Sequence, residues 1–303
     1  MLRRAFSSLT RVGFVGTGRM GNPMAANLLK SGLKVRVFDT NPALVNNLVS
    51  QGAVAVKNLE EVVEDVEAVV TMLPETKHVE AVCRTLKAKA KVGTIFIDSS
   101  TIHPQASKKL AEELYKEGLH FLDAPVSGGV AGATAGTLTF MVGGDAAVYE
   151  KAKNLFAAMG KNLFYCGPQG AGLAAKICNN LSLAIQMVAT AEALNLGVMM
   201  GADPKKLTEV MGVSTSNCWS LNTVNPVPGV LTNSPSSRNY EGGFATELMM
   251  KDIKIALETA QEVGAHLGLG KRSYEYYNRS KELGAGNKDF GYVYQVIKDK
   301  KMD

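Results

Sequence analysis

The sequence predicts an α/β domain followed by an all-α domain built on one long apolar helix. Three observations lead to this prediction. Short apolar runs alternate with amphipathic stretches from Arg11 to about Tyr165, which is typical of βαβ units and a mainly parallel sheet. The strand signal then ends after Gly172. Residues 173–200 form a nearly uncharged stretch of Ala, Leu, Ile, Met and Asn, which indicates a long helix.

The elements of both domains follow from these patterns. In the first domain we expect strands at residues 11–15, 34–38, 68–72, 94–98, 119–122, 138–142 and 163–165, and helices at residues 22–32, 104–116 and 146–159. In the second domain we expect helices at residues 173–200, 204–211, 246–263 and 271–283, with an irregular segment at residues 225–243. The predicted domains are therefore residues 11–168 and 169–303.

The helix at residues 173–200 also bears on assembly. A helix that is apolar nearly all round is normally buried. It is therefore expected to form the core of the second domain or to be shared with a partner subunit. Since one domain of this size does not readily cover such a helix, we expect a homodimer or homotetramer.

The turn after the first strand has the spacing GxGxxG. Gly16 permits a tight turn, Gly18 lets the backbone approach a pyrophosphate, and Gly21 lets the following helix pack close to the strand. The phosphates would lie at the helix N-terminus, where free N–H groups and the helix dipole favour negative charge. The strand, the turn, the helix and the second strand together predict a Rossmann-type dinucleotide-binding domain.

Asp39 ends the second strand, eighteen residues after Gly21. A carboxylate at this place accepts hydrogen bonds from the adenosine ribose hydroxyls and repels a 2′-phosphate, so it favours NAD over NADP. The alternative is that Asp39 is only a turn residue at a strand end.

Composition and charge restrict the class of protein. The chain has 46% hydrophobic and 20% charged residues, as soluble globular proteins do. Its formal charge of +5 comes partly from arginines near the N-terminus, so we expect no nucleic-acid partner. We judge no apolar run long enough to cross a bilayer and expect no membrane partner. The cysteines and histidines lack metal-ligand spacing, so we expect no metal.

The first nine residues, MLRRAFSSL, contain two arginines, two serines and no acid. This composition resembles a mitochondrial presequence, although an ordinary disordered terminus is the alternative. We therefore expect residues 1–10 to be a targeting segment and the protein to be located in the mitochondrial matrix.

Polar or turn-forming residues follow three of the predicted strands, at residues 71–74, 98–101 and 123–129. Ligands of open α/β sheets bind outside the carboxyl ends of the strands. Any one such segment more often ends a strand and caps the next helix. Three of them at one sheet edge indicate a binding site.

Lys176 is the sharpest candidate for chemistry. It lies near the start of the apolar helix, with Asn179 and Asn180 three and four residues later, so all three are predicted to project from one side. A lysine in a buried apolar helix is costly unless it is used, and burial lowers its pKa toward neutrality. The alternative is a lysine that extends to solvent from the helix end.

Four motifs together resemble the β-hydroxyacid dehydrogenase family, and the resemblance covers nearly all of the chain from Arg11 onward. The motifs are the turn at residues 16–21, the loop at residues 123–129, the segment at residues 170–180 and the pair Lys251-Asp252. The resemblance implies that Lys176 is the general acid/base. It implies a substrate-binding set made of Ser127, Gly128, Gly129, Asn179 and Asn180. It implies an NAD-binding set made of Gly16, Thr17, Gly18, Arg19, Met20, Gly21, Asp39, Leu73, Pro74, Thr101 and Lys251.

The resemblance further implies that the substrate is a small 3-hydroxy acid, oxidised with NAD. Residues 218–220 and 225–229 resemble the branch of the family that acts on hydroxyisobutyrate. The same scaffold also serves tartronate semialdehyde, succinic semialdehyde and 6-phosphogluconate chemistry, and these alternatives stay open. A non-catalytic oligomerising scaffold is a further alternative, which predicts loss of the lysine at position 176.

Overall fold

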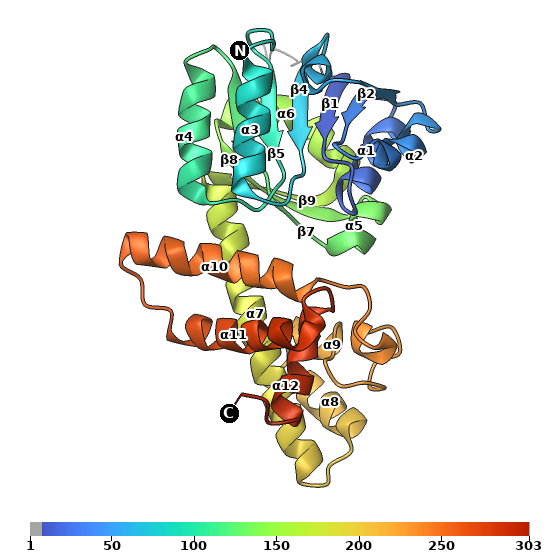
Figure 1. Cartoon of the computed structure of the whole chain (residues 1–303), viewed down its shortest axis with the longest axis vertical. Helices are drawn as coiled ribbons and strands as arrows, with labels where there is room; N and C mark the ends of the chain where they lie inside the picture. Colours follow the sequence, from blue (N-terminus) through green and yellow to red (C-terminus); the bar gives the residue numbers. More distant parts are fainter. Residues whose placement is uncertain (1–7, 303) are drawn as a thin grey trace, which may run out of the picture. The chain divides into compact units, whose positions relative to one another are not determined.

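The computed structural model describes residues 8–302, so most of the expected targeting segment lies outside the described residues. The chain forms two compact units, Met1–Lys176 and Ile177–Asp303 (Figure 1). The division falls eight residues after the domain boundary expected from the sequence. The difference arises because the first turns of the long helix pack with the sheet of the first unit.

The first unit is built on a sheet of nine strands within residues 8–302. The strands are β1 (Arg11–Val15), β2 (Lys34–Phe38), β3 (Val54–Ala55), β4 (Ala68–Thr71), β5 (Ile95–Asp98), β6 (His120–Asp123), β7 (Val126–Ser127), β8 (Leu138–Gly144) and β9 (Gly160–Gly167). Their spatial order is β3-β2-β1-β4-β5-β6-β8-β7, with β9 paired to β8. Strands β1 to β6 pair in parallel, whereas β8 is antiparallel to β6 and β7. The predicted mainly parallel sheet is confirmed.

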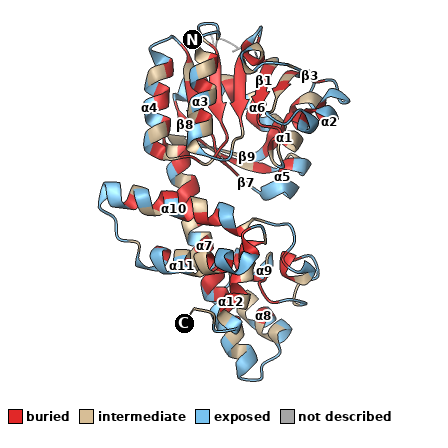
Figure 2. Ribbon diagram, in the orientation of Figure 1, coloured by how far each residue is buried: buried red, intermediate tan, exposed pale blue. Residues whose placement is uncertain are grey.

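Helices cover both faces of this sheet. They are α1 (Gly21–Lys30), α2 (Asn46–Val49), α3 (Thr76–Lys87), α4 (Pro104–Tyr115), α5 (Gly129–Ala135) and α6 (Ala146–Met159). One core contains Phe14, Met24 and Phe140, and a separate core contains Phe96 and Leu110. Because neighbouring residues of one strand enter opposite cores, the central strands are buried along their length, as Figure 2 shows.

The second unit is helical. Its main helices are α7 (Ala171–Met199), which begins in the first unit, α8 (Pro204–Gly212), α9 (Trp219–Asn222), α10 (Thr246–Val263), α11 (Gly268–Ser280) and α12 (Val293–Lys298). Its core joins Met187 and Leu194 of α7 to Ile253 of α10 and Tyr277 of α11. The predicted fold class, an α/β domain followed by a helical domain with one long apolar helix, is confirmed.

Some local predictions were inaccurate. The segment at residues 123–129, expected to be a loop, contains β7, because Val126 and Ser127 pair with Phe140 and Thr139 of β8. Helix α11 begins three residues before the expected position and ends at Ser280, where a π-helical turn follows. In contrast, two other helices were predicted with the correct bounds, at residues 146–159 (α6) and 246–263 (α10).

The expectation that no apolar run could span a membrane was wrong as stated. Among the described residues, α7 is the one helix long and apolar enough to do so by length and composition, with a mean hydropathy of 1.4 over its most apolar window. A buried core helix passes the same test. However, only 33% of that window is buried inside the structure, so α7 presents much of its surface outward.

The carboxyl ends of β4 and β5 are linked by a buried carboxylate. Asp98 is 1% exposed, and its Oδ1 accepts hydrogen bonds from the Thr71 hydroxyl at 2.7 Å and from the Ser100 N–H at 3.1 Å. The Ser100 hydroxyl in turn accepts from the Leu73 N–H at 2.9 Å. Burial raises the pKa of Asp98 to about 6. The segments after β4 and β5 are thereby held together.

We predict that Asp98→Asn stabilises the protein more at pH 8 than at pH 4. A folded-state pKa of about 6 lies above the unfolded value, so the contribution of Asp98 is fully present below the unfolded pKa and is lost as the pH rises through 6. Asparagine has no such dependence. The difference in free energy of unfolding between variant and parent should therefore grow by about 1–3 kcal/mol from pH 4 to pH 8.

Urea unfolding at both pH values measures this difference, with the exposed Glu112→Gln as control. A difference between Asp98→Asn and the parent that stays the same at the two pH values would contradict the prediction.

Candidate active site

The glycine-rich turn has the geometry that its three glycines predict. Gly16 has a φ of +90°, and a Cβ there would lie 2.4 Å from the Met72 carbonyl oxygen. A Cβ on Gly21 would lie 1.8 Å from the Gly16 carbonyl oxygen, so only glycine allows α1 to start this close to β1. In contrast, apart from its chain neighbours, no described residue has an atom within 4 Å of the Cβ position of Gly18. Its backbone is open to a ligand.

Asp39 lies beside this turn at the end of β2. Its Oδ2 accepts from the Thr17 N–H at 2.7 Å, and its Oδ1 accepts from the Asn41 N–H at 2.9 Å. These bonds tie the end of β2 to the turn. Arg19 is exposed, and Met20 directly precedes α1. An open glycine backbone, a helix N-terminus and a carboxylate at the next strand end fit the phosphates and ribose of a dinucleotide.

Leu73 and Pro74 follow β4, and Thr101 follows β5. Thr71 and Asp98 are register partners, so both segments leave the same edge of the sheet as the glycine-rich turn. These residues, predicted to contact the cofactor, are thus grouped with the turn in the first unit. Lys251 lies on α10, in the second unit.

The segment from Ser127 to Gly129 has a backbone that few residues could adopt. Ser127 ends β7, Gly128 has a φ of +131° and Gly129 a φ of +60°, both in the region that favours glycine. Apart from its chain neighbours and the backbone of α5, which begins here, no described residue has an atom within 4 Å of a Cβ built on Gly129. The segment therefore presents a hydroxyl group and open backbone, which suits the carboxylate of a small molecule.

The three polar residues near the start of α7 differ in exposure. Lys176 is 8% exposed and Asn180 is 2% exposed, one helical turn apart. Asn179 is exposed and donates from its Nδ2 to Asn180 Oδ1 at 3.1 Å. Residues three and four apart are neighbours on a helix surface, so Asn179 differs from Lys176 and Asn180 in its exposure rather than in the side of the helix.

Asp252 is a site residue for which no role was predicted from the sequence. Its Oδ2 accepts from Asn180 Nδ2 at 2.6 Å, and its Oδ1 lies 3.2 Å from Lys251 Nζ. Asp252 is 3% exposed, so this contact fixes the Asn180 amide in the interior of the second unit. The sequence feature that could have identified Asp252 is its position directly after Lys251, in a pair already noted as a family motif.

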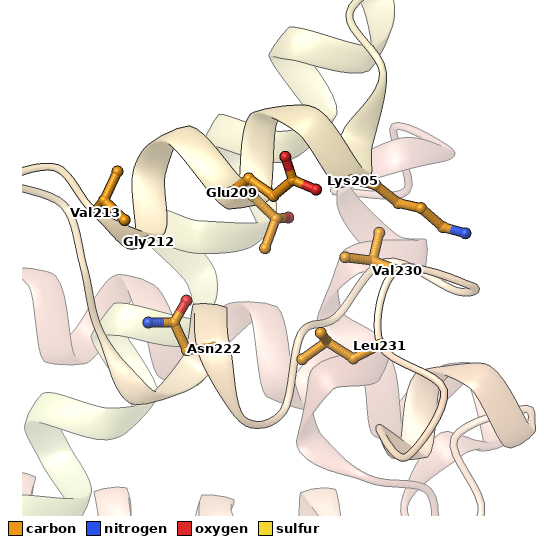
Figure 3. Close-up of a pocket in the computed structure, with 8 residues that line it drawn as sticks. Lys205, Glu209, Gly212, Val213, Asn222, Val230 and Leu231 are labelled. Carbon is orange, nitrogen blue, oxygen red and sulfur yellow. The ribbon is translucent and has the colours of Figure 1, made fainter.

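One pocket among the described residues lies away from these residues. It has a volume of about 500 Å³ and is bounded by α8 and the segments after α8 and α9 (Figure 3). Its lining residues are Lys205, Thr208, Glu209, Gly212, Val213, Asn222, Val230 and Leu231. No predicted site residue is among them. Within residues 8–302, no three His, Cys, Asp or Glu side chains are grouped as metal ligands.

Family models match both parts of the chain. The model described as the NAD binding domain of 6-phosphogluconate dehydrogenase matches residues 11–167. The model described as NAD-binding of NADP-dependent 3-hydroxyisobutyrate dehydrogenase matches residues 170–297. The protein therefore binds a nicotinamide dinucleotide.

Individual relatives are similar over nearly the whole chain. The mitochondrial 3-hydroxyisobutyrate dehydrogenase of Homo sapiens is 44% identical, over 98% of this chain and 89% of its own length. The NAD-dependent L-serine dehydrogenase of Pseudomonas aeruginosa is also 44% identical, over 95% and 98%. The structure of the Mycobacterium tuberculosis 3-hydroxyisobutyrate dehydrogenase with L-serine is 37% identical, with a TM-score of 0.91 over 95% of this chain and 99% of that one. This chain belongs to the 3-hydroxyisobutyrate dehydrogenase family of NAD-dependent β-hydroxyacid dehydrogenases.

Proposed function

We propose that this enzyme oxidises 3-hydroxyisobutyrate to methylmalonate semialdehyde, a step of valine breakdown. The observation that carries the proposal is the buried Lys176, which lies in the same unit as the glycine-rich turn and the Ser127–Gly129 segment. The names of the relatives that are 44% identical support the choice of substrate. The intact lysine disfavours the non-catalytic scaffold.

Each residue then has a role that its surroundings allow. The hydroxyl group of Ser127 and the backbone N–H groups at Gly128 and Gly129 bind the substrate carboxylate. Lys176 acts in its neutral form and accepts the proton of the substrate hydroxyl group, which general-base assistance accelerates about 10²- to 10⁴-fold. Asn180, held by Asp252, orients the hydroxyl oxygen. The glycine-rich turn and Asp39 would hold NAD⁺, which would supply the acceptor for the hydride that leaves the carbon carrying this oxygen.

L-serine is the second candidate substrate. One relative that is 44% identical is named an L-serine dehydrogenase, and the similar structure was determined with L-serine. Serine is itself a 3-hydroxy acid, with an amino group where hydroxyisobutyrate has a methyl group. Both acids therefore suit the same lysine and the same carboxylate site. Tartronate and succinic semialdehyde chemistry, reached from glycerate and 4-hydroxybutyrate, are further alternatives.

Initial rates of NADH formation decide between these substrates. The purified chain is assayed with NAD⁺ or NADP⁺ against 3-hydroxyisobutyrate, L-serine, glycerate, 4-hydroxybutyrate and 6-phosphogluconate. We expect the highest kcat/KM for 3-hydroxyisobutyrate and a preference for NAD⁺, because Asp39 lies where a 2′-phosphate would be bound. A higher kcat/KM for another acid would refute the proposed substrate, and a preference for NADP⁺ would refute the role of Asp39.

Lys176→Ala should lower kcat at least 10²-fold, because no other general base replaces the amine. The Kd for NADH, measured by fluorescence titration, should stay within about twofold of the parent value. The exposed Lys205→Ala, on α8, is the matched control and should keep the parent kcat. Turnover by Lys176→Ala at the parent rate would remove Lys176 from the mechanism.

We also propose that the protein is a homodimer or homotetramer that does not insert into membranes. The support is α7, an apolar helix whose outward surface includes Leu196 (61% exposed) and Met199 (67% exposed). Burial of apolar surface in a subunit interface is the usual reason for such exposure. Multi-angle light scattering should give a mass of two or four times 32.3 kDa without detergent. A monomer mass at micromolar concentration would contradict this proposal.

We further propose that the protein is imported into mitochondria. The support is the Arg- and Ser-rich start of the chain and the mitochondrial location in the names of several relatives, although a bacterial relative is equally identical. Residues 1–10 fused to a fluorescent protein should direct it to mitochondria, and Arg3→Glu/Arg4→Glu should prevent this. Diffuse fluorescence of the unmodified fusion would contradict this role of residues 1–10.

A further inference from the structure

The side chain of Asp123 is hydrogen-bonded to a segment that is distant in the sequence. Asp123 ends β6 and is fully buried. Its Oδ1 accepts from the Gly170 N–H at 2.7 Å and from Gln169 Nε2 at 2.8 Å. Its Oδ2 accepts from the Leu173 N–H at 2.9 Å. All these donors lie at the start of α7, some fifty residues later in the chain.

This carboxylate therefore caps the helix that carries Lys176. The first N–H groups of a helix have no partner within the helix, and a negative charge there interacts favourably with the helix dipole. Caps normally come from the residue directly before the helix. Here Gly170 occupies that position and has no side chain, so the oxygens of Asp123 take over its role.

Two glycines make room for this contact. A Cβ on Gly143 of β8 would lie 2.6 Å from Asp123 Oδ1 and 2.8 Å from the Gly172 nitrogen. A Cβ on Gly172 would lie 2.9 Å from Asp123 Oδ2 and 2.1 Å from the Met141 carbonyl oxygen. The carboxylate is thus closely packed between β8 and the start of α7.

We propose that Asp123 is a positioning residue for Lys176. Its backbone leads within four residues to Ser127, and its side chain holds the helix turn directly before Lys176. Leu173 and Lys176 are three residues apart, or about 4.5 Å along a helix axis. One residue thereby fixes the distance between the segment that binds the substrate carboxylate and the amine that accepts the proton. This inference rests on the proposed role of Lys176.

Kinetics of Asp123→Ala and Asp145→Ala test the proposal. Asp145 is the matched control because it caps α6 in the same unit, accepting from the Ala147 and Val148 N–H groups. We expect Asp123→Ala to lower kcat about 10- to 100-fold at unchanged KM for NAD⁺, because small displacements of a reacting group are costly. Asp145→Ala should lower the Tm but keep kcat within about twofold of the parent. Equal kcat in both variants would overturn the proposal.

A second readout does not depend on the substrate. Reductive methylation followed by peptide mass spectrometry measures how fast Lys176 reacts in each variant. We expect Asp123→Ala to raise this rate several-fold over Asp145→Ala, since the released helix turn exposes the amine. An unchanged rate would overturn the positioning role. If the parent oxidises none of the hydroxy acids, the proposed function fails, whereas the methylation rates still decide the role of Asp123.

If Asp123→Ala does not fold, Asp123→Asn replaces it. Asparagine has the same shape but only one acceptor oxygen, so either Gly170 or Leu173 loses its partner. We expect a decrease in kcat of about fivefold and a matching rise in methylation of Lys176. Parent values for both quantities would overturn the proposal.

Discussion

Burial of the parallel sheet on both faces is the constraint from which the other features of the first unit follow. Strand interiors such as Val69–Val70 and Phe96–Ile97 have no place for a polar side chain. Thr71, Asp98 and Asp123 are therefore found where β4, β5 and β6 end, and the parallel register puts these ends side by side. The edge becomes polar, and its carboxylates organise the chain segments that meet there.

Much of this arrangement could be predicted from the sequence, because it depends on local chemistry. The turn at residues 16–21 combines a positive φ, an open backbone and a close helix approach within six residues. The bounds of α6 and α10 follow from helical periodicity alone. Lys176 was identified because a charged residue is rare in so apolar a helix.

The rest could not be predicted, because it depends on residues distant in the chain. Asp123 looks like part of the loop that follows it, yet its partners lie 46 to 50 residues later. Asn180 and Asp252 are 72 residues apart, and nothing near Asn180 indicates its partner. The burial of α7 was overestimated for a different reason. Composition measures how apolar a helix is and not how much of it the rest of one chain can cover.

The close contact of Gly143 and Gly172 around a carboxylate has a consequence for how this family varies. These glycines belong to no nucleotide-binding turn, and neither has the positive φ that favours glycine. Their lack of a side chain is nevertheless required by neighbours on three separate elements. A Cβ on Gly143 would lie 2.8 Å from the Gly172 nitrogen, and one on Gly172 would lie 2.1 Å from the Met141 carbonyl oxygen, so loss of the carboxylate alone would not make room for a side chain. Both positions should therefore remain glycine even where the residue at position 123 changes.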